Sequence, residues 1–528
     1  MIKINQLKLP VGHSQKDLED KIRKTLRIPS KETFHYEVMR RSLDARKKPS
    51  LFYVYCIYVT IRQENSIVKK LHQPSVSLVT ETGYRFSEMG HERLNRRPVI
   101  VGAGPCGLFA AWQLTLAGYA PLILERGKQV EDRSADVERF WKTGILQPDS
   151  NVQFGEGGAG TFSDGKLNTG VKDPSGRNRY VLETFVKFGA PSEILYDAKP
   201  HIGTDILAKV IKNMRDYLIE HGAEFRFQTC LKDIQIKENA LQALVTEDDT
   251  VIPADVAILA LGHSARDTFT MLHRHQLPME AKNFAVGFRV EHPQQMINDA
   301  MYGNALRLPA APYKVTSNFP NGRGVYSFCM CPGGYVVNAS SMKEKTCVNG
   351  MSYSGRSGKN ANSAIIVSVS PADYGAQDPL DGMHFQETLE HKTYQLGNGK
   401  IPQQLFGDYR QNIASQGYGD FNSQTKGQTC FANLRGLMTE DMEHSFLLGM
   451  EHFSNIIPQF DRSDAILSGM ETRTSSPVRI MRDTNGESRV HGIYPGGEGA
   501  GYAGGIMSAA MDGLRLADDV MKRYHPVY

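Results

Sequence analysis

The fold is decided by a stretch of thirteen residues, Val99-Ile100-Val101-Gly102-Ala103-Gly104-Pro105-Cys106-Gly107-Leu108-Phe109-Ala110-Ala111. A short β-branched run passes directly into glycines and then into an apolar stretch rich in alanine and leucine. This order predicts the strand, tight turn and helix of a nucleotide-binding βαβ unit. In such a unit Gly102 permits the turn, Gly104 lets the backbone approach a pyrophosphate, and Gly107 lets the helix pack closely on the strand. Pro105 fits the first helical turn, where its missing N–H is no loss.

An acidic residue follows at the end of the next predicted strand. That strand runs from Ala120 to Leu124, and Glu125 lies 23 positions after Gly102. A carboxylate there can accept hydrogen bonds from both ribose hydroxyls of an adenosine. The glycines and this acid together therefore predict a bound dinucleotide.

Three later segments favour FAD over NAD as that dinucleotide. Residues 153–167 form a loop of small side chains, whose backbone can approach a flat ring system closely. Residues 256–261 form a buried-type strand that ends at Gly262, and the glycine-rich turn 492–505 leads into an amphipathic helix. We assign the cofactor site to Gly102, Gly104, Pro105, Cys106, Gly107, Glu125, Arg126, Gly157, Gly158, Ala159, Gly160, Leu231, Gly262, Glu498, Gly499 and Ala500.

These motifs together resemble the FAD-dependent oxidoreductases of the glutathione-reductase-like superfamily with two dinucleotide folds. More narrowly, the segments 155–167, 327–334 and 471–479 look like a bacterial family of uncharacterised FAD-dependent dehydrogenase-like proteins. The resemblance covers essentially the whole chain and implies a cytosolic bacterial flavoprotein. In that superfamily an acid in the C-terminal turn holds the ribityl chain and phosphates, a role usually given to aspartate and taken here by Glu498.

The fold class that we predict is α/β, with four segments. Residues 1–95 form a small basic α+β domain, with a helix at 17–26 and strands at 34–38 and 51–61. Residues 96–282 form the first part of a discontinuous Rossmann-like FAD-binding domain, and residues 460–528 form its C-terminal part. Residues 283–459 form an inserted α+β substrate or cap domain. No second glycine fingerprint lies there, so we expect any NAD(P)H to dock transiently as electron donor.

The cysteines of the inserted segment have two interpretations. Cys329 and Cys331 are separated by one residue, which is not the spacing of a dithiol relay. Because Pro332-Gly333-Gly334 follows, turn residues are the preferred interpretation. A zinc site would need a second pair of ligands at a suitable spacing. The sequence has no such pair, and we predict no metal site.

Candidate catalytic residues follow from the need for proton transfer. Histidine side chains ordinarily titrate near neutral pH, so His201 and His263 are the candidates for a proton donor, with ordinary structural histidines as the alternative. Arg473 and Arg479 are candidates for binding a substrate carboxylate, and ion pairs between domains are the alternative.

Composition and charge limit the remaining functions. The 528 residues are 40% hydrophobic and 22% charged, which excludes a disordered or fibrous chain, and no apolar run approaches the ~20 residues of a membrane span. Seven cysteines make no disulfide framework, and we expect a soluble cytoplasmic protein. The first 98 residues hold 20 basic and 10 acidic residues, including the cationic stretch 40–49. We read this stretch as a solvated hairpin tip, although it could face an anionic partner.

The function predicted is an FAD-dependent oxidoreductase that transfers hydride through non-covalent FAD to or from an unknown small organic substrate. One alternative is a flavoprotein acting on tRNA through its basic N-terminal domain, although no aromatic RNA-binding signature supports nucleic acid. The other is a non-catalytic flavin-binding sensor. The sequence makes no prediction about the oligomeric state.

Overall fold

A parallel sheet carries the glycine motif, in a computed structural model that describes residues 1–80, 83–303 and 308–527. The sheet has the order β24-β12-β6-β7-β8, so strands from distant parts of the chain become neighbours. β6 and β12 are paired in register over three residues, as are β6 and β7. The strands are short and, except for β8, fully buried: β6 (Val99–Val101), β7 (Leu122–Leu124), β8 (Glu224–Arg226), β12 (Ala257–Leu259) and β24 (Ile493–Pro495).

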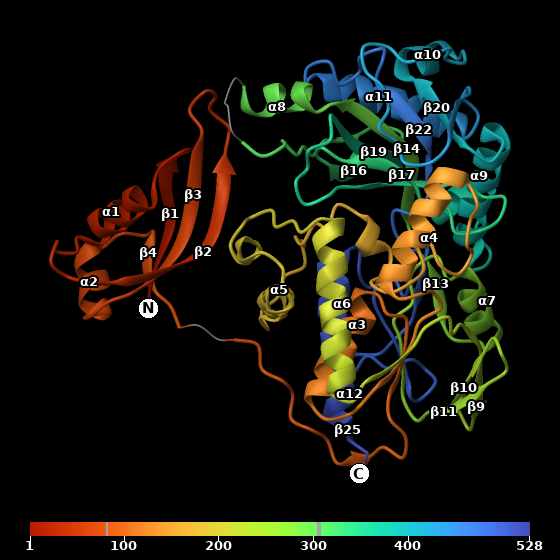
Figure 1. The fold of residues 1–528 in the computed structure, drawn as a ribbon, viewed down its shortest axis with the longest axis horizontal. Coiled ribbons are helices and arrows are strands. Elements are labelled where there is room, and N and C mark those ends of the chain that lie inside the picture. Colours follow the sequence, from red (N-terminus) through yellow and green to blue (C-terminus); the bar gives the residue numbers. More distant parts are fainter. Residues whose placement is uncertain (81–82, 304–307, 528) are drawn as a thin grey trace.

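Helices that lie far apart in the sequence pack together beside this sheet. α3 (Pro105–Leu116) follows β6 directly and packs against α12 (Ile506–Arg523), and α6 (Thr204–Glu220) also packs against α3 (Figure 1). α5 (Arg177–Lys187) covers the other side of α12. These helices share one apolar core, which includes Phe109, Leu114, Met214 and Leu514. The strand–turn–helix prediction and the C-terminal helix are confirmed, and the fold class is α/β.

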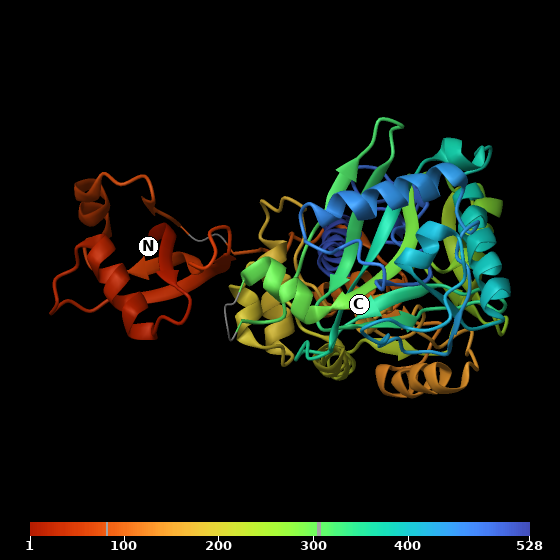
Figure 2. The same cartoon turned by 90° about the horizontal axis from the view of Figure 1, so that it is seen from above.

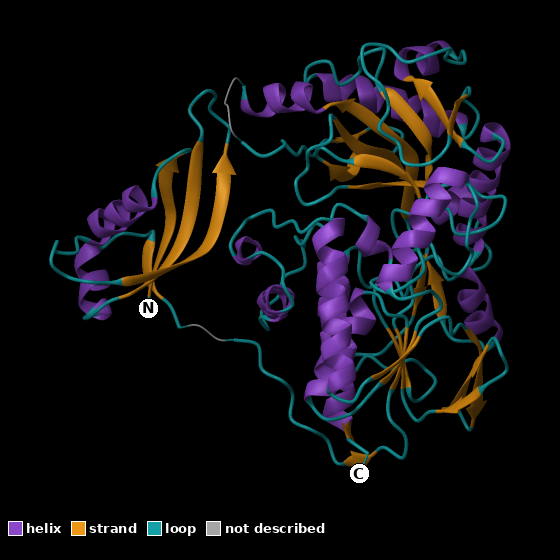
Figure 3. Cartoon of the chain, viewed as in Figure 1, coloured by secondary structure: helices purple, strands orange, loops and turns teal. Residues whose placement is uncertain are grey.

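The inserted segment contains a second, larger sheet. Its seven strands have the order β15-β16-β19-β14-β22-β20-β21, and helices cover it, as the secondary-structure colouring of Figure 3 shows. The central pair, β14 and β19, is antiparallel over ten residues. The elements are β14 (Phe284–Pro293), α8 (Gln294–Tyr302), β15 (Thr316–Asn318), β16 (Gly324–Cys331), β19 (Asn360–Val369), α9 (Asp381–Gly397), β20 (Ile401–Leu405), α10 (Phe406–Gln411), β21 (Thr429–Phe431), α11 (Glu440–Ser454) and β22 (Ile466–Glu471).

The chain returns to the first domain later than predicted. β22 pairs with β14 and β20, so residues 466–471 belong to the seven-stranded sheet and not to a segment that begins at 460. After it, β23 (Val478–Ile480) pairs with β13 (Met279–Ala281) and brings the chain back toward the parallel sheet. The sequence pattern missed this because Ile466–Glu471 is a fully buried run, whose pattern does not show which of the two sheets it joins.

The N-terminal unit is a four-stranded antiparallel sheet with two helices, and it projects from the rest of the molecule (Figures 1 and 2). It has an apolar core of its own. Arg41 and Asp197 connect it to the body, with 2.7 Å between Nη2 and Oδ1. Its elements are β1 (Ile2–Pro10), α1 (Gln15–Leu26), β2 (His35–Asp44), β3 (Phe52–Thr60), α2 (Glu64–Leu71) and β4 (Val76–Leu78).

The cationic stretch of this unit is only partly a loop. β2 continues through Asp44, so residues 40–44 are strand and the hairpin tip is shorter than predicted. Arg46 pairs with Asp44 at 2.8 Å, and the Lys48 ammonium contacts the backbone oxygen of Ala300. Two of the cations at the tip therefore have partners within the chain.

Smaller elements complete the described chain. They are β5 (Glu92–Arg93), α4 (Val130–Thr143), β9 (Leu231–Lys237), β10 (Ala240–Thr246), β11 (Val251–Pro253), α7 (Arg266–Arg274), β17 (Tyr335–Asn338), β18 (Val348–Met351) and β25 (Tyr524–His525). Among the residues that the structure describes, no helix combines the length and apolar character that crossing a bilayer requires.

Candidate flavin-binding cavity

A cavity of about 750 Å³ opens at the carboxyl ends of β6, β7 and β12. Ligands of open α/β sheets bind at this edge, and the volume lies within the usual range for small-molecule and cofactor sites. The cavity extends from the N-terminus of α3 to the seven-stranded sheet, where Phe328 and Cys329 line it. One continuous space therefore connects the dinucleotide motif with the inserted segment.

The glycine turn forms one end of the cavity. Gly102 has a φ of +105°, and a Cβ there would lie 2.5 Å from the backbone oxygen of Ala260, so only glycine fits. At Gly104, in contrast, a Cβ would project into space, with the Cα of Gly158 nearest at 3.8 Å. The first N–H groups of α3 have no intrahelical acceptors and carry the positive end of the helix dipole. The turn is therefore shaped to receive an anionic group against backbone.

Glu125 lies at the end of β7 and is only 5% exposed. Its carboxylate accepts hydrogen bonds from the backbone N–H groups of Ala103 at 2.8 Å, Gly127 at 2.9 Å and Gly155 at 2.9 Å. The acid thus holds three separate loops around the cavity. Its contact with a ribose, predicted from the sequence, remains a prediction.

The small-residue loop is organised by a buried arginine that the sequence analysis did not single out. Arg133 of α4 is fully buried and donates hydrogen bonds to the backbone oxygens of Asn151, Val152, Gly155, Glu156 and Gly158, at distances of 2.6 to 3.2 Å. Burial lowers its pKa to about 10. Because one guanidinium binds five carbonyls, this irregular loop keeps a defined shape without regular secondary structure.

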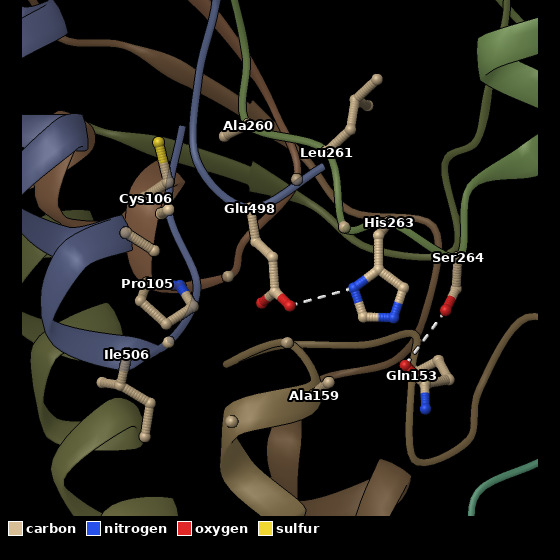
Figure 4. Close-up of a pocket in the computed structure, with 18 of the residues that line it drawn as sticks. Pro105, Cys106, Gln153, Ala159, Ala260, Leu261, His263, Ser264, Glu498 and Ile506 are labelled. Atoms are coloured by element: carbon tan, nitrogen blue, oxygen red, sulfur yellow. Dashed lines mark hydrogen bonds and ion pairs between the residues drawn. The ribbon is translucent and has the colours of Figure 1, made fainter. Parts of the chain in front are cut away.

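His263 and Glu498 face one another across the cavity (Figure 4). His263 Nδ1 lies 3.1 Å from Glu498 Oε1, and its buried Nε2 has no hydrogen-bond partner among the residues that the structure describes. The ring is only 8% exposed, and beside it the Ser264 hydroxyl donates to Gln153 at 3.1 Å. When the carboxylate accepts from Nδ1–H, neutral His263 presents Nε2 as an acceptor.

Arg473 lines the cavity, but four of its five N–H donors bind other residues of the chain. It donates to Glu390 of α9 from Nε and Nη2, each at 2.9 Å, and to the hydroxyls of Ser264 and Ser341 from Nη1. Arg266 binds the same Glu390 carboxylate, whose pKa is held well below its usual range by the two guanidiniums despite burial. The geometry therefore matches the ion-pair alternative for Arg473 and not the binding of a substrate carboxylate.

Arg479 lies outside the cavity lining. Its guanidinium donates to the backbone oxygen of Gly501 at 3.4 Å and sits over the ring of Tyr502. The substrate-binding role predicted for Arg479 has no support in this position.

A charged cluster lies at the inserted-segment end of the cavity. Asp164 is buried and accepts hydrogen bonds from Ser352 at 2.6 Å and Arg356 at 2.5 Å, with the Lys166 ammonium 3.6 Å away. Although burial opposes ionisation, Lys166 and Arg356 hold the pKa of Asp164 below its usual value. Asp164 and Lys166 line the cavity.

His201 lies behind this cluster. Its Nε2 is 3.8 Å from Asp164, and it is not among the cavity-lining residues. Burial lowers its pKa to about 4, so the ring is neutral at pH 7 and is a poor proton donor there. The catalytic role of His201 stays a prediction that this placement does not support: after burial, Arg356 and Lys166 also lower its pKa, while Asp164 raises it.

The predicted cofactor residues divide into two groups. Those that line the cavity are Gly102, Gly104, Pro105, Cys106, Glu125, Arg126, Gly158, Ala159, Gly160, Leu231, Gly262 and Glu498. Gly107, Gly157, Gly499 and Ala500 are not among the lining residues; at Gly107 and Gly499 the lack of a Cβ lets backbone segments approach one another. A Cβ on Gly107, for example, would lie 1.9 Å from the backbone oxygen of Gly102.

Several residues at the far end of the cavity were not predicted as site residues from the sequence. Lys166, Phe328 and Asn349 line it, and Cys329 does so from the end of β16 and not from a turn. Lys166 is the only cation in the loop 153–167, which was a usable signal. No local pattern connects Asn349 or Phe328 with that loop, because the contact depends on how the two sheets pack.

Comparisons with known proteins agree with this geometry. Residues 283–474 match the family described as FAD-dependent protein, C-terminal domain-like, and residues 100–139 match the NAD(P)-binding Rossmann-like domain. Residues 1–60 match a domain of unknown function. A protein of Clostridium beijerinckii, named only as uncharacterized, is 42% identical over 531 residues that cover 99% of both chains.

Two solved structures are similar at a distance. Quinol fumarate reductase FrdA of E. coli is 11% identical, with a TM-score of 0.36 and coverage of 82% of this chain and 70% of that one. Glycerol-3-phosphate dehydrogenase of Bacillus halodurans, solved with FAD, is also 11% identical, with a TM-score of 0.36 and coverage of 82% and 65%.

Proposed function

The chain belongs to the same family as the Clostridium beijerinckii relative, and its residues 283–474 match the C-terminal domain-like family of FAD-dependent proteins. On this premise we propose that it transfers hydride between a reduced donor and a small organic acceptor through non-covalently bound FAD. FAD is the cofactor, and the chain is an FAD-dependent oxidoreductase. When bound, FAD supplies an isoalloxazine ring that accepts and returns hydride. The observation that carries the proposal is the continuous cavity from the α3 N-terminus to the inserted segment.

In this proposal the chain binds the dinucleotide mainly through backbone. The N–H groups at the start of α3 bind the pyrophosphate, since Gly104 leaves the approach open. Glu125 accepts a ribose hydroxyl with the lone pairs that its three backbone contacts leave free. Glu498 holds His263 in one orientation, so that Nε2 can accept a hydrogen bond from a hydroxyl of the cofactor.

The inserted segment forms the part of the cavity where, in this proposal, the reactant that exchanges hydride with FAD binds. Phe328 and Cys329 on β16, and Asn349 on β18, line it together with Lys166 of the small-residue loop. We propose that this segment, 283–474 by the family match, is a substrate or cap domain, and that NADH or NADPH docks there transiently. Placing the reactants between two sheets excludes water, which protects hydride transfer from side reactions.

The test is the visible absorption spectrum of the purified protein under anaerobic conditions, before and after addition of NADH and then NADPH. We expect a flavin spectrum that bleaches with one nicotinamide and recovers when an organic acceptor is added. If dithionite bleaches the flavin but neither nicotinamide does, the nicotinamide step is wrong. In that case either an organic substrate reduces the flavin, or the protein is a flavin-binding sensor that has no electron donor.

A further inference from the structure

At its inserted-segment end, the cavity is lined by two side chains that can donate hydrogen bonds to a ligand. They are Lys166 of the loop 153–167 and Asn349 of β18. Phe328 and Cys329 of β16 lie at the same end, where a bulge shifts the register of this strand against β19. Hydride transfer requires that the second reactant be held in one orientation. The contacts assigned to the cofactor leave this end of the cavity without a ligand.

The amide of Asn349 is oriented by a buried arginine. Arg289 of β14 is fully buried, and its Nη2 donates a hydrogen bond to Asn349 Oδ1 at 2.9 Å. The backbone N–H of Gly350 donates to the same oxygen at 2.7 Å. A guanidinium and a backbone N–H only donate, so the atom that faces them is the amide oxygen. Asn349 Nδ2 donates to none of the residues that the structure describes, and it is left as a donor at the cavity wall.

Neighbouring strands hold Arg289 in this position. Its Nε pairs with Glu471 of β22, and its Nη1 donates to the backbone oxygen of Cys329 at 2.8 Å. A Cβ on Gly350 would lie 2.3 Å from Nη1, so glycine is required where the guanidinium passes β18. The donor on Asn349 is therefore fixed before any ligand arrives.

Lys166 brings a positive charge to the same end of the cavity. Its ammonium donates to the backbone oxygen of Met330, the residue after Cys329. The nearest carboxylate oxygen of Asp164 lies 3.6 Å from Nζ, beyond hydrogen-bond distance, and pairs with Arg356. An ammonium has three N–H donors, so Lys166 keeps at least one for a ligand.

The charged groups around Lys166 do not cancel. The cluster contains three cations and two acids: Lys166, Lys199, Arg356, Asp164 and Asp205. His201 beside it is neutral at pH 7, and Arg289 is balanced by Glu471. Burial, followed by the charges of Lys166 and Arg356, lowers the pKa of Lys199. Because unbalanced charge away from water is costly, this end of the cavity favours an anionic ligand.

We propose that the organic reactant is a carboxylic acid, whose carboxylate is bound at this end of the cavity by the N–H donors of Lys166 and Asn349. The inference rests on the proposed function and names the chemical class of its substrate. A carboxylate offers two acceptor oxygens and the negative charge that the cluster lacks, whereas an amide or an alcohol is uncharged. Lys166 and Asn349 thus take the role that the sequence suggested for Arg473 and Arg479.

The experiment titrates the oxidised, FAD-loaded protein with acetate, benzoate and succinate and follows the absorption spectrum of the flavin. Each acid is compared with its uncharged amide, namely acetamide, benzamide and succinamide, which have nearly the same shape. Sodium chloride at the same ionic strength is the control for non-specific effects of salt. We expect at least one acid to perturb the flavin spectrum and to bind at least about tenfold more tightly than its amide, because the amide carries no charge.

Two variants test the assignment of the donors. Lys166→Gln removes the charge. Asn349→Asp keeps an oxygen for Arg289 and Gly350 but replaces Nδ2 with a second oxygen, which repels an acid. Each variant should weaken binding of the acid about 10- to 100-fold, the loss of one charge-assisted hydrogen bond, and should leave FAD affinity within about threefold of the wild type. Lys237→Gln is the matched control and should change neither, because the Lys237 side chain is 75% exposed on β9 and lies outside the cavity lining.

The carboxylate proposal is overturned if no acid perturbs the flavin spectrum, if the amides bind as tightly as the acids, or if both variants bind the acid as the wild type does. It is also overturned if the variants weaken FAD binding in place of acid binding, since the donors would then belong to the flavin site. The comparison of acid with amide in the wild type decides even where a variant folds poorly.

Flavin content and bleaching by nicotinamide are measured on the same samples, which separates this inference from the proposed function. A protein that holds flavin and bleaches, but responds to none of the acids, contradicts the carboxylate site alone. A protein without flavin contradicts both.

Discussion

The substitution Gly104→Ala should weaken FAD binding while leaving the stability of the apoprotein nearly unchanged. The glycine has a φ of −75° and a ψ of −177°, which alanine adopts without strain, and an added Cβ meets nothing closer than 3.8 Å. As the N-cap of α3, the change costs the apoprotein less than about 1 kcal/mol. The methyl group, however, occupies the space through which a pyrophosphate reaches the helix N-terminus. Losing two charge-assisted hydrogen bonds of about 1.5–3 kcal/mol each weakens FAD binding by about 3–6 kcal/mol, or roughly 10²- to 10⁴-fold.

The assay compares three variants with the wild-type protein. Apoprotein is titrated with FAD by fluorescence, and thermal unfolding is measured without the cofactor. Gly417→Ala is the matched control, because Gly417 is exposed, has open space around it and lies outside the cavity lining. Gly107→Ala should instead impair folding, since its Cβ would lie 1.9 Å from a backbone oxygen. Wild-type FAD affinity in Gly104→Ala, or an equal loss in Gly417→Ala, would refute the reasoning.

Three further predictions concern stability and binding. Burial lowers the pKa of His292 from 6.5 to about 4. As the pH falls below 6.5, the unfolded chain therefore takes up a proton on this histidine before the folded chain does. The free energy of unfolding should drop by up to about 3 kcal/mol between pH 6.5 and pH 4 for this reason. In urea unfolding, the free energy of unfolding of His292→Gln should depend less steeply on pH between 4 and 6.5 than that of the wild type. An unchanged pH dependence would contradict the lowered pKa of His292. Arg473→Met should cost about 3 kcal/mol of unfolding free energy by breaking the pair with Glu390, whereas normal stability with weaker substrate binding would restore the carboxylate role. Glu125→Gln should weaken FAD binding about 10- to 100-fold in the same titration, because one acceptor oxygen becomes a donor facing backbone N–H groups; unchanged affinity would remove Glu125 from the site.

The dinucleotide half of the cavity could be predicted from sequence because its signals are local. The glycines after β6, the acid after β7 and the turn before α12 are each set by a strand end and a following helix. The parallel pairing of β6 with β7 and β12 then brings these strand ends to one edge of the sheet. Short-range backbone requirements therefore specify this end of the site.

The other half of the cavity depends on contacts that no local pattern carries. Arg133 was an ordinary helical arginine in the sequence, and its burial beneath the loop appears only when α4 packs there. Cys329 was interpreted as a turn residue, because the bulge that places it in the cavity wall results from pairing with β19. Arg473 and Glu390 are 83 residues apart, so their ion pair follows from the packing of the inserted segment.

The measurement that tests the central claim most directly is the flavin content of the purified protein. The protein is denatured without protease, the precipitate is removed, and the flavin in the supernatant is identified by chromatography and counted against chain concentration. We predict about one FAD per chain, all of it released, and almost none from Gly104→Ala. A wild-type protein without flavin, or one whose flavin stays with the precipitated chain, would contradict the account of a non-covalent FAD site in this cavity.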